Sequence, residues 1–190
     1  STDIDGVEVN SAGPAVNKLN RNLGTNYSVS DLYNHWAMVD LVKKDRPNVE
    51  DPMRYVIDLW NDNDVISIAR PEEGSWLVAW YLQKEGVMQH RITSRPSSLK
   101  TTTLDWYRRI MPWVDPDMIH IQEDNNSSGL DFKIREIKRL GVDFHFEDSW
   151  EHTEEIVSKT KATVILVPQP WNIYYNPDKD SRIIVLPQEN

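Results

Sequence analysis

The sequence contains no cysteine among its 190 residues. This absence excludes disulfides, thiolate catalysis and cysteine-ligated zinc. No apolar run is long enough to span a membrane, and no basic segment followed by an apolar one marks a secretory signal in the chain as given. We therefore expect a cytoplasmic protein without a membrane partner.

Positive charge is also scarce, because the formal net charge is −9. Binding to a nucleic-acid backbone depends on clustered Lys and Arg, so a nucleic-acid polymer is not an expected partner. A small phosphate ester is still acceptable, since a metal ion and one lysine can create a local positive field. The length predicts one domain with an insertion, and the oligomeric state stays open.

The most informative motif is Asp3-Ile4-Asp5-Gly6-Val7 at the start of the chain. If residues 1–4 end a strand, alternation aims Asp3 and Asp5 to one side. Carboxylates on a rigid strand edge can hold Mg²⁺ and leave coordination positions for water and phosphate oxygens. Taken alone, the motif also fits an acidic surface turn.

A second segment, Ile92-Thr93-Ser94-Arg95-Pro96, places hydroxyls where a proline ends a strand. A hydroxyl and backbone N–H groups at a strand end can hold phosphate oxygens. The alternative role for Thr93 is to cap the following helix.

Two further segments carry charges of opposite sign. Lys133 lies at the head of a helix whose apolar residues recur at helical spacing, and from the first turn it can reach an anion. Glu147 and Asp148 follow a short alternating strand, and adjacent carboxylates there are unfavourable unless a cation pairs with them. A solvated lysine and a capping acid are the alternatives.

These four blocks together resemble the haloacid dehalogenase-like (HAD) superfamily of phosphohydrolases, over nearly the whole chain. The matching positions are Asp3-Ile4-Asp5-Gly6-Val7, Thr93, Lys133 and Glu147-Asp148-Ser149. Within the superfamily the sequence is most similar to small deoxyribonucleotidase-like members. The resemblance implies a magnesium-dependent phosphatase that hydrolyses a small phosphate monoester, with a nucleoside monophosphate as one candidate.

The resemblance also implies roles for the acidic residues. Asp3 would attack phosphorus to form an aspartyl-phosphate, and Asp5 would protonate the leaving oxygen and then activate water, so we expect a raised pKa for Asp5. Mg²⁺ would be held by the Asp3 side chain, the Asp5 backbone carbonyl and Asp148, with Glu147 as a further candidate.

Other positions would contact the substrate. Thr93, Ser94 and Lys133 would bind the oxygens of the transferring phosphoryl group. The side chains that could contact the rest of the substrate are Arg95, Trp36, Trp60 and Trp171. Arg95 has a second possible role, which is to pair with an acid.

The pattern of strands and helices predicts an α/β fold with a Rossmann-like parallel sheet covered by helices on both faces. Strands are expected at 118–121, 144–146 and 163–167, and helices at 75–85 and 99–110. In the helix at 75–85 we expect Trp76, Leu77, Trp80 and Tyr81 to face inward.

Residues 1–8 and 69–190 would form the core of this fold, and residues 9–68 a small helical cap inserted after the first strand. Within the insertion one helix should begin near Ser30 and another run from Pro52 to Trp60.

One feature departs from the superfamily pattern, because only Ser1 and Thr2 precede Asp3. A short strand would hold the nucleophile loosely, and a displacement of about 1 Å can cost about 100-fold in rate. The alternatives are therefore a catalytically weak HAD-like protein that binds a phosphorylated ligand, or a phosphotransferase or phosphomutase of the same fold.

Overall fold

The computed structural model describes residues 1–123, 128–175 and 180–187. Its centre is a set of parallel strands: β3 (Arg91–Pro96), β4 (Ile119–Gln122), β5 (Phe144–Glu147), β6 (Thr163–Leu166) and β7 (Ile183–Val185). β3 pairs with β4, β5 with β6, and β6 with β7. The expected parallel sheet is confirmed.

The amino-terminal residues join the two halves of this sheet. Thr2 forms parallel bridges to Arg91 of β3 and to Phe146 of β5. Its N–H donates to the carbonyl of His90 at 2.9 Å, and the N–H of Asp3 donates to the carbonyl of Phe146 at 2.9 Å. Asp3 therefore leaves the sheet between β3 and β5, near its middle.

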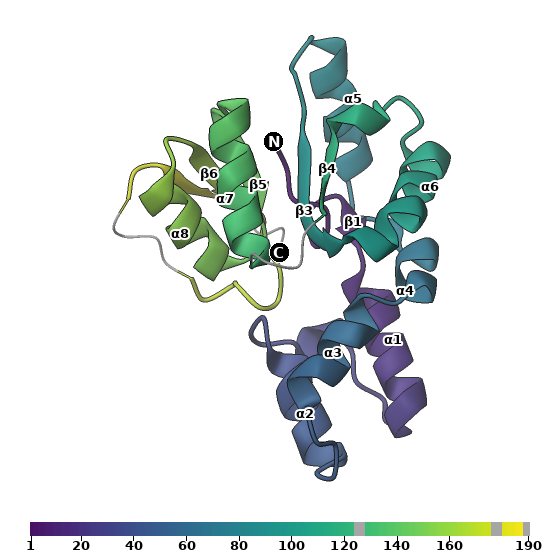
Figure 1. The fold of residues 1–190 in the computed structure, drawn as a ribbon. Coiled ribbons are helices and arrows are strands. Elements are labelled where there is room, and N and C mark those ends of the chain that lie inside the picture. Colours follow the sequence, from purple (N-terminus) through teal and green to yellow (C-terminus); the bar gives the residue numbers. More distant parts are fainter. Residues whose placement is uncertain (124–127, 176–179, 188–190) are drawn as a thin grey trace.

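Helices cover both faces of the sheet (Figure 1). On one face, α5 (Ser75–Lys84) and α6 (Lys100–Ile110) share a core with Ile4, Ile119 and Ile121. On the other, α7 (Gly129–Leu140) and α8 (Trp150–Lys159) pack with Ile92 and Val164. Alternate strand residues therefore supply the two cores, as the pleat requires.

Helix α5 corrects one expectation. Trp76, Leu77, Trp80 and Tyr81 are 41–57% exposed, and Ala79 is the buried residue of the helix. Residues 76–82 are all apolar, so apolar side chains surround the helix and only one side can face the sheet. The expectation that these four side chains face inward was wrong.

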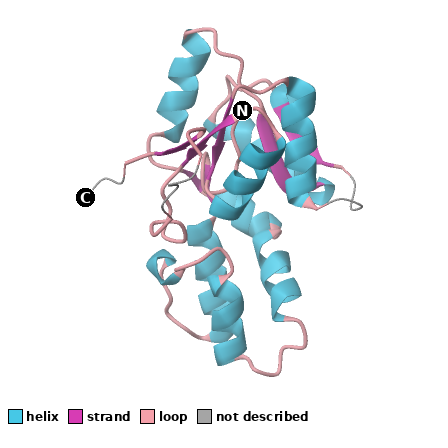
Figure 2. Ribbon diagram, turned by 90° about the vertical axis from the view of Figure 1, so that its left-hand side faces the viewer, coloured by secondary structure: helices cyan, strands magenta, loops and turns pink. Residues whose placement is uncertain are grey.

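Four helices follow the first strand in sequence: α1 (Ala12–Leu23), α2 (Ala37–Asp45), α3 (Pro52–Trp60) and α4 (Asn63–Ile68). We call residues 12–68 the helical block. Its helices share one core, which Leu99 and Trp171 join from the sheet part. Figure 2 shows the block beyond one end of the strands.

The chain enters and leaves the helical block through two short strands that pair antiparallel, β1 (Val9–Asn10) and β2 (Arg70–Pro71). Helix α2 begins later than the expected start near Ser30. Residues 29–31 instead form a short 3-10 turn, closed by reciprocal hydrogen bonds between Ser28 and Asp31. Among the described residues, no helix is long and apolar enough to cross a membrane.

Candidate active site

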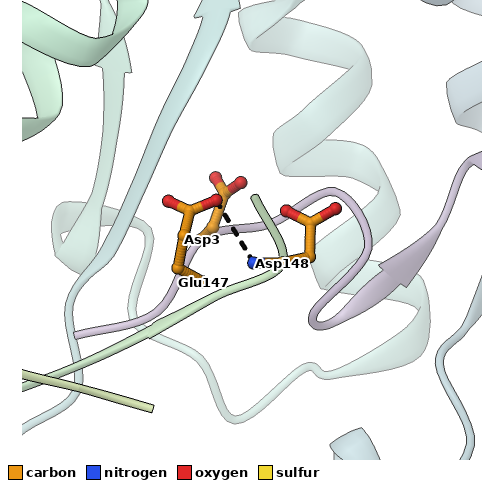
Figure 3. Close-up of side chains that lie close together, drawn as sticks. All are labelled: Asp3, Glu147 and Asp148. Carbon is orange, nitrogen blue, oxygen red and sulfur yellow. Dashed lines mark hydrogen bonds between the residues drawn. The ribbon is translucent and has the colours of Figure 1, made fainter. Parts of the chain in front are cut away.

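Three buried carboxylates meet at the carboxyl ends of the central strands. Asp3 follows the central segment, Glu147 ends β5, and Asp148 comes next in the chain. One oxygen from each lies within 4.8 Å of the others, and the three carboxyl groups point to the same side (Figure 3). The side chains come together because parallel strands end at one edge of a sheet, which is where ligands bind in this fold class.

Lys133 is the cation of this cluster. Its Nζ lies 2.8 Å from Asp3 Oδ2 and 2.8 Å from Glu147 Oε2. Burial alone would lower the pKa of Lys133, but the two carboxylates outweigh burial and raise it. The lysine lies on the second turn of α7, one turn later than expected. It remains charged at neutral pH and belongs to the buried cluster.

The pKa values of the three carboxyl groups beside this one cation shift in different directions. Burial raises the pKa of Asp3 to about 6, against the opposing effect of Lys133. Burial and the neighbouring Glu147 charge raise the pKa of Asp148 well above its usual value. For Glu147, burial would raise the pKa, but Lys133 and His145 hold it well below its ordinary range. One ammonium group therefore does not neutralise the cluster.

The donor set fits a hard divalent cation. All three groups are carboxylates, which Mg²⁺ prefers. Asp3 Oδ1 is buried and has no hydrogen-bond partner, which is unfavourable unless another group satisfies it. A divalent cation would satisfy this oxygen and balance the excess negative charge. Asp3, Asp148 and Glu147 are the side chains that could hold it.

Gly6 brings the first turn of the chain against Asp148. It has φ +72°, and a Cβ at this position would lie 2.3 Å from Asp148 Oδ2. Glycine is therefore required both for the left-handed backbone and for the close approach.

The loop after β6 holds the same region from the other side. Trp171 Nε1 donates to Asp148 Oδ2 at 3.1 Å, and Asn172 Nδ2 donates to the Asp148 carbonyl at 2.7 Å. Gln169 Nε2 donates to the Gly6 carbonyl at 2.8 Å. These contacts join segments that lie 163 and 24 residues apart along the chain, so no local spacing predicts them.

Solved structures share this architecture. Protein tyrosine kinase A from Mycobacterium tuberculosis is 15% identical, with 98% of this chain and 92% of that chain covered and a TM-score of 0.66. A predicted phosphoglycolate phosphatase from Haemophilus somnus is 14% identical, with 96% and 91% covered and a TM-score of 0.62. A HAD family hydrolase from Deinococcus radiodurans, with bound phosphate and sodium, is 18% identical, with 89% and 82% covered and a TM-score of 0.55.

The chain has the fold of the HAD hydrolases. No protein-family model matches the sequence, and no curated protein matches it either. Asp3, Thr93 and Glu147 lie on three neighbouring segments at the middle of this sheet.

Asp5 lies beside this cluster but has its own partner. Arg95 Nε is 2.8 Å from Asp5 Oδ2, and Arg95 Nη2 is 2.7 Å from Oδ1. A third nitrogen of the guanidinium donates to Thr103 at 3.0 Å, and the Arg95 side chain is buried. Arg95 therefore pairs with an acid and is not free to bind substrate.

This pairing corrects the expected pKa of Asp5. Burial would raise that pKa, but the Arg95 guanidinium outweighs burial and holds it below the usual value. The expectation of a raised pKa was wrong, because the sequence does not show that Arg95 reaches Asp5.

Thr93 and Ser94, the two hydroxyl residues of β3, have different environments. Thr93 is buried, and its Oγ1 accepts a hydrogen bond from the Arg95 N–H at 3.2 Å. Ser94 is exposed next to the start of α7, where a Cβ on Gly129 would lie 2.3 Å from the Ser94 Cβ. Ser94 therefore lies beside backbone N–H groups of a helix N-terminus, an environment that favours an anion.

The three candidate tryptophans are not brought together. Trp36 is 44% exposed, whereas Trp60 packs against the core of the helical block. Trp171 is buried and bonded to Asp148, so its ring is not open to a substrate. Of the three, only Trp36 offers an exposed ring.

Proposed function

We propose that this protein is a magnesium-dependent phosphatase that hydrolyses a small phosphate monoester through an aspartyl-phosphate. The observation that carries the proposal is the buried cluster of Asp3, Glu147 and Asp148 with Lys133 among them. Phosphoryl transfer requires positioning and compensation of negative charge rather than complex covalent chemistry. The HAD fold of the solved phosphatases supports the same reaction class.

Asp3 is the nucleophile in this scheme. A carboxylate oxygen attacks phosphorus, the bond from phosphorus to the ester oxygen breaks, and the alcohol leaves with a proton from Asp5. Asp5 then takes a proton from the water that attacks the acyl phosphate, which releases inorganic phosphate and restores Asp3. During this cycle the Asp5 carboxyl group has to break its contact with Arg95 and contact the leaving oxygen instead.

Mg²⁺ would be held by the Asp3 side chain, the Asp5 backbone carbonyl and Asp148, with Glu147 nearby. When bound, it supplies positive charge that offsets the repulsion between the carboxylates and the phosphoryl oxygens. The ammonium group of Lys133 also contributes positive charge. It has three N–H donors, and two of them contact Asp3 and Glu147.

The phosphoryl oxygens would be bound by Thr93, Ser94 and Lys133. Ser94 and the start of α7 provide donors that suit a phosphate. The buried Thr93 hydroxyl accepts a hydrogen bond from the backbone N–H of Arg95, within the part of β3 where the register with β4 shifts and where Ser94 lies.

A screen of phosphate monoesters with and without Mg²⁺ tests this proposal. The panel contains nucleoside monophosphates, sugar phosphates and an aryl phosphate, and released phosphate is measured. We expect release that requires Mg²⁺ and is lost in Asp3→Asn. Ligand binding without turnover would instead support a binding protein, and transfer of phosphate to an added sugar without release would support a phosphotransferase.

A further inference from the structure

Helix α5 is apolar on every side, yet most of its surface is uncovered. All residues from Trp76 to Leu82 are apolar, and Ala79 is the one residue of the helix that is buried. Val78 is 52% exposed and Tyr81 is 57% exposed. A helix that is hydrophobic all round is normally buried on all sides. A single copy of the chain therefore leaves most of the apolar surface of α5 without a partner.

The part of the sheet that lies across from α5 is uncovered in the same way. Val164 of β6 is fully buried in the core that α7 and α8 share. On the opposite face Phe144 of β5 is 54% exposed, Ile165 of β6 is half-buried, and Ile184 of β7, which pairs with Ile165, is 45% exposed. Parallel sheets normally have both faces covered. This half of the sheet is apolar on both faces but covered on one.

An apolar groove with a volume of about 680 Å³ separates α5 from this face of the sheet. Val78 and Leu82 line it from the helix, and Phe144 and Ile165 line it from the strands. The amino terminus lies between the two walls (Figure 1). A projecting apolar helix and an apolar groove therefore lie side by side, and we call them together the α5 surface.

The area of the α5 surface is large for a monomer. In the part of the chain that the structure describes, ten of the seventeen large apolar side chains that are exposed belong to it. Seven lie between residues 76 and 88, and the others are Phe144, Ile184 and Leu186. They are 36–72% exposed, which amounts to roughly 1,000 Å² at about 200 Å² for a whole side chain. The largest apolar patch of a monomer is about 300–600 Å², and a stable complex buries about 800 Å² on each partner.

The charges at the α5 surface favour one kind of partner. Glu72, Glu73 and Asp143 line the groove, so an anionic membrane or an acidic peptide is disfavoured. A second copy avoids this repulsion if the two α5 helices are antiparallel. Their amino-terminal ends, which carry Glu72 and Glu73, then lie at opposite ends of the pair, and their dipoles oppose each other. A helix beside a groove on one surface is also self-complementary, as a twofold interface requires.

We propose that the α5 surface joins two copies of this chain in a twofold dimer, with α5 of one copy lying antiparallel along the groove of its partner. Val78 of one copy faces Leu82 of the partner subunit, because both side chains lie on the groove side of α5. The outer side chains of the helix, Leu77 and Tyr81, contact the partner's strands. Every side of α5 is then buried, in agreement with its composition.

Sedimentation velocity of the full chain tests the dimer. We expect a dimer at a protein concentration of about 10 µM. Tyr81→Glu and Phe144→Glu place a charge in the interface, one from the helix and one from the sheet, and each should raise the dissociation constant by about 100-fold or more. The matched control is Met53→Glu on α3, which changes an apolar side chain that is 39% exposed outside the α5 surface. Its dissociation constant should equal that of the unmodified protein.

Circular dichroism of the same variants shows that they fold, since the replaced side chains are exposed. A monomer at about 10 µM would overturn the proposal, because an interface of this area binds in the micromolar range or tighter. A dimer that persists in both Tyr81→Glu and Phe144→Glu would place the interface elsewhere and would also overturn it.

The antiparallel arrangement has its own test, because the chain contains no cysteine and introduced thiols are unique. Val78→Cys and Leu82→Cys are prepared separately, mixed and oxidised. A disulfide needs Cα atoms within about 7 Å, so we expect a crosslinked dimer with one chain of each variant, in severalfold higher yield than from either variant alone. Equal yields from the mixture and the separate variants would contradict the antiparallel pair.

Discussion

The guanidinium of Arg95 holds both carboxylate oxygens of Asp5, at 2.8 and 2.7 Å. This contact keeps Asp5 ionised, because it lowers the pKa of a group that burial alone would raise. In the proposed reaction Asp5 has to carry a proton when the alcohol leaves. The pair therefore stabilises the form of Asp5 that acts as a base and disfavours the form that acts as an acid.

Replacing Arg95 should change the pH dependence in a defined direction. In Arg95→Met the pKa of Asp5 should rise, so the alkaline limb of kcat/KM for an alkyl phosphate should move up by about one pH unit or more. An aryl phosphate with a good leaving group needs no proton and should show little shift. Arg95→Lys keeps the positive charge but loses the paired contact, and should give a smaller shift. An unmoved limb, or a shift to lower pH, would show that Arg95 does not control Asp5.

Gly6 offers a test of the contact between the first turn and Asp148. In Gly6→Ala the added Cβ meets both the positive φ and Asp148 Oδ2 at 2.3 Å. Gly24 is the matched control, because it has φ +71° and nothing within 4 Å of the built Cβ. In thermal or urea unfolding, the positive φ alone should lower the free energy of unfolding by about 1 to 2 kcal/mol in both variants. Only Gly6→Ala should also lose Mg²⁺ binding and turnover, and equal Mg²⁺ affinity in both would refute the proposed arrangement.

Magnesium binding should release protons in weakly acidic solution. Asp3 has a pKa of about 6, and the pKa of Asp148 is well above its ordinary value, so both hold protons that a cation must displace. We expect the apparent Mg²⁺ affinity to rise as the pH increases from about 5 to about 7. Calorimetry in buffers of different ionisation enthalpy measures the released protons, and Asp3→Asn should release fewer. An affinity that does not depend on pH would contradict the assignment of these ligands.

The sequence predicted the parts of the fold that depend on local pattern. Thr93 and Glu147 follow short segments that contain apolar residues, and parallel strands bring their carboxyl ends to one edge, so the sheet could be predicted. Lys133 was found because apolar residues at helical spacing surround it.

Contacts between distant segments could not be predicted in the same way. Arg95 lies 90 residues from Asp5, and no spacing rule shows that its side chain turns toward that carboxylate. The expectation of which side chains of α5 face inward was also wrong, because its apolar run has no polar side that would define an orientation.

The central claim is that Asp3 becomes phosphorylated during turnover. The most direct measurement is mass spectrometry of the protein after rapid acid quenching of a reaction with Mg²⁺ and the best ester from the screen. We predict the added mass of one phosphoryl group on the peptide that contains Asp3, and no such peptide in Asp3→Asn, which should also lose turnover by ~10³-fold or more. Turnover that persists in Asp3→Asn, or full turnover with no phosphorylated Asp3 at any quench time, would contradict this account.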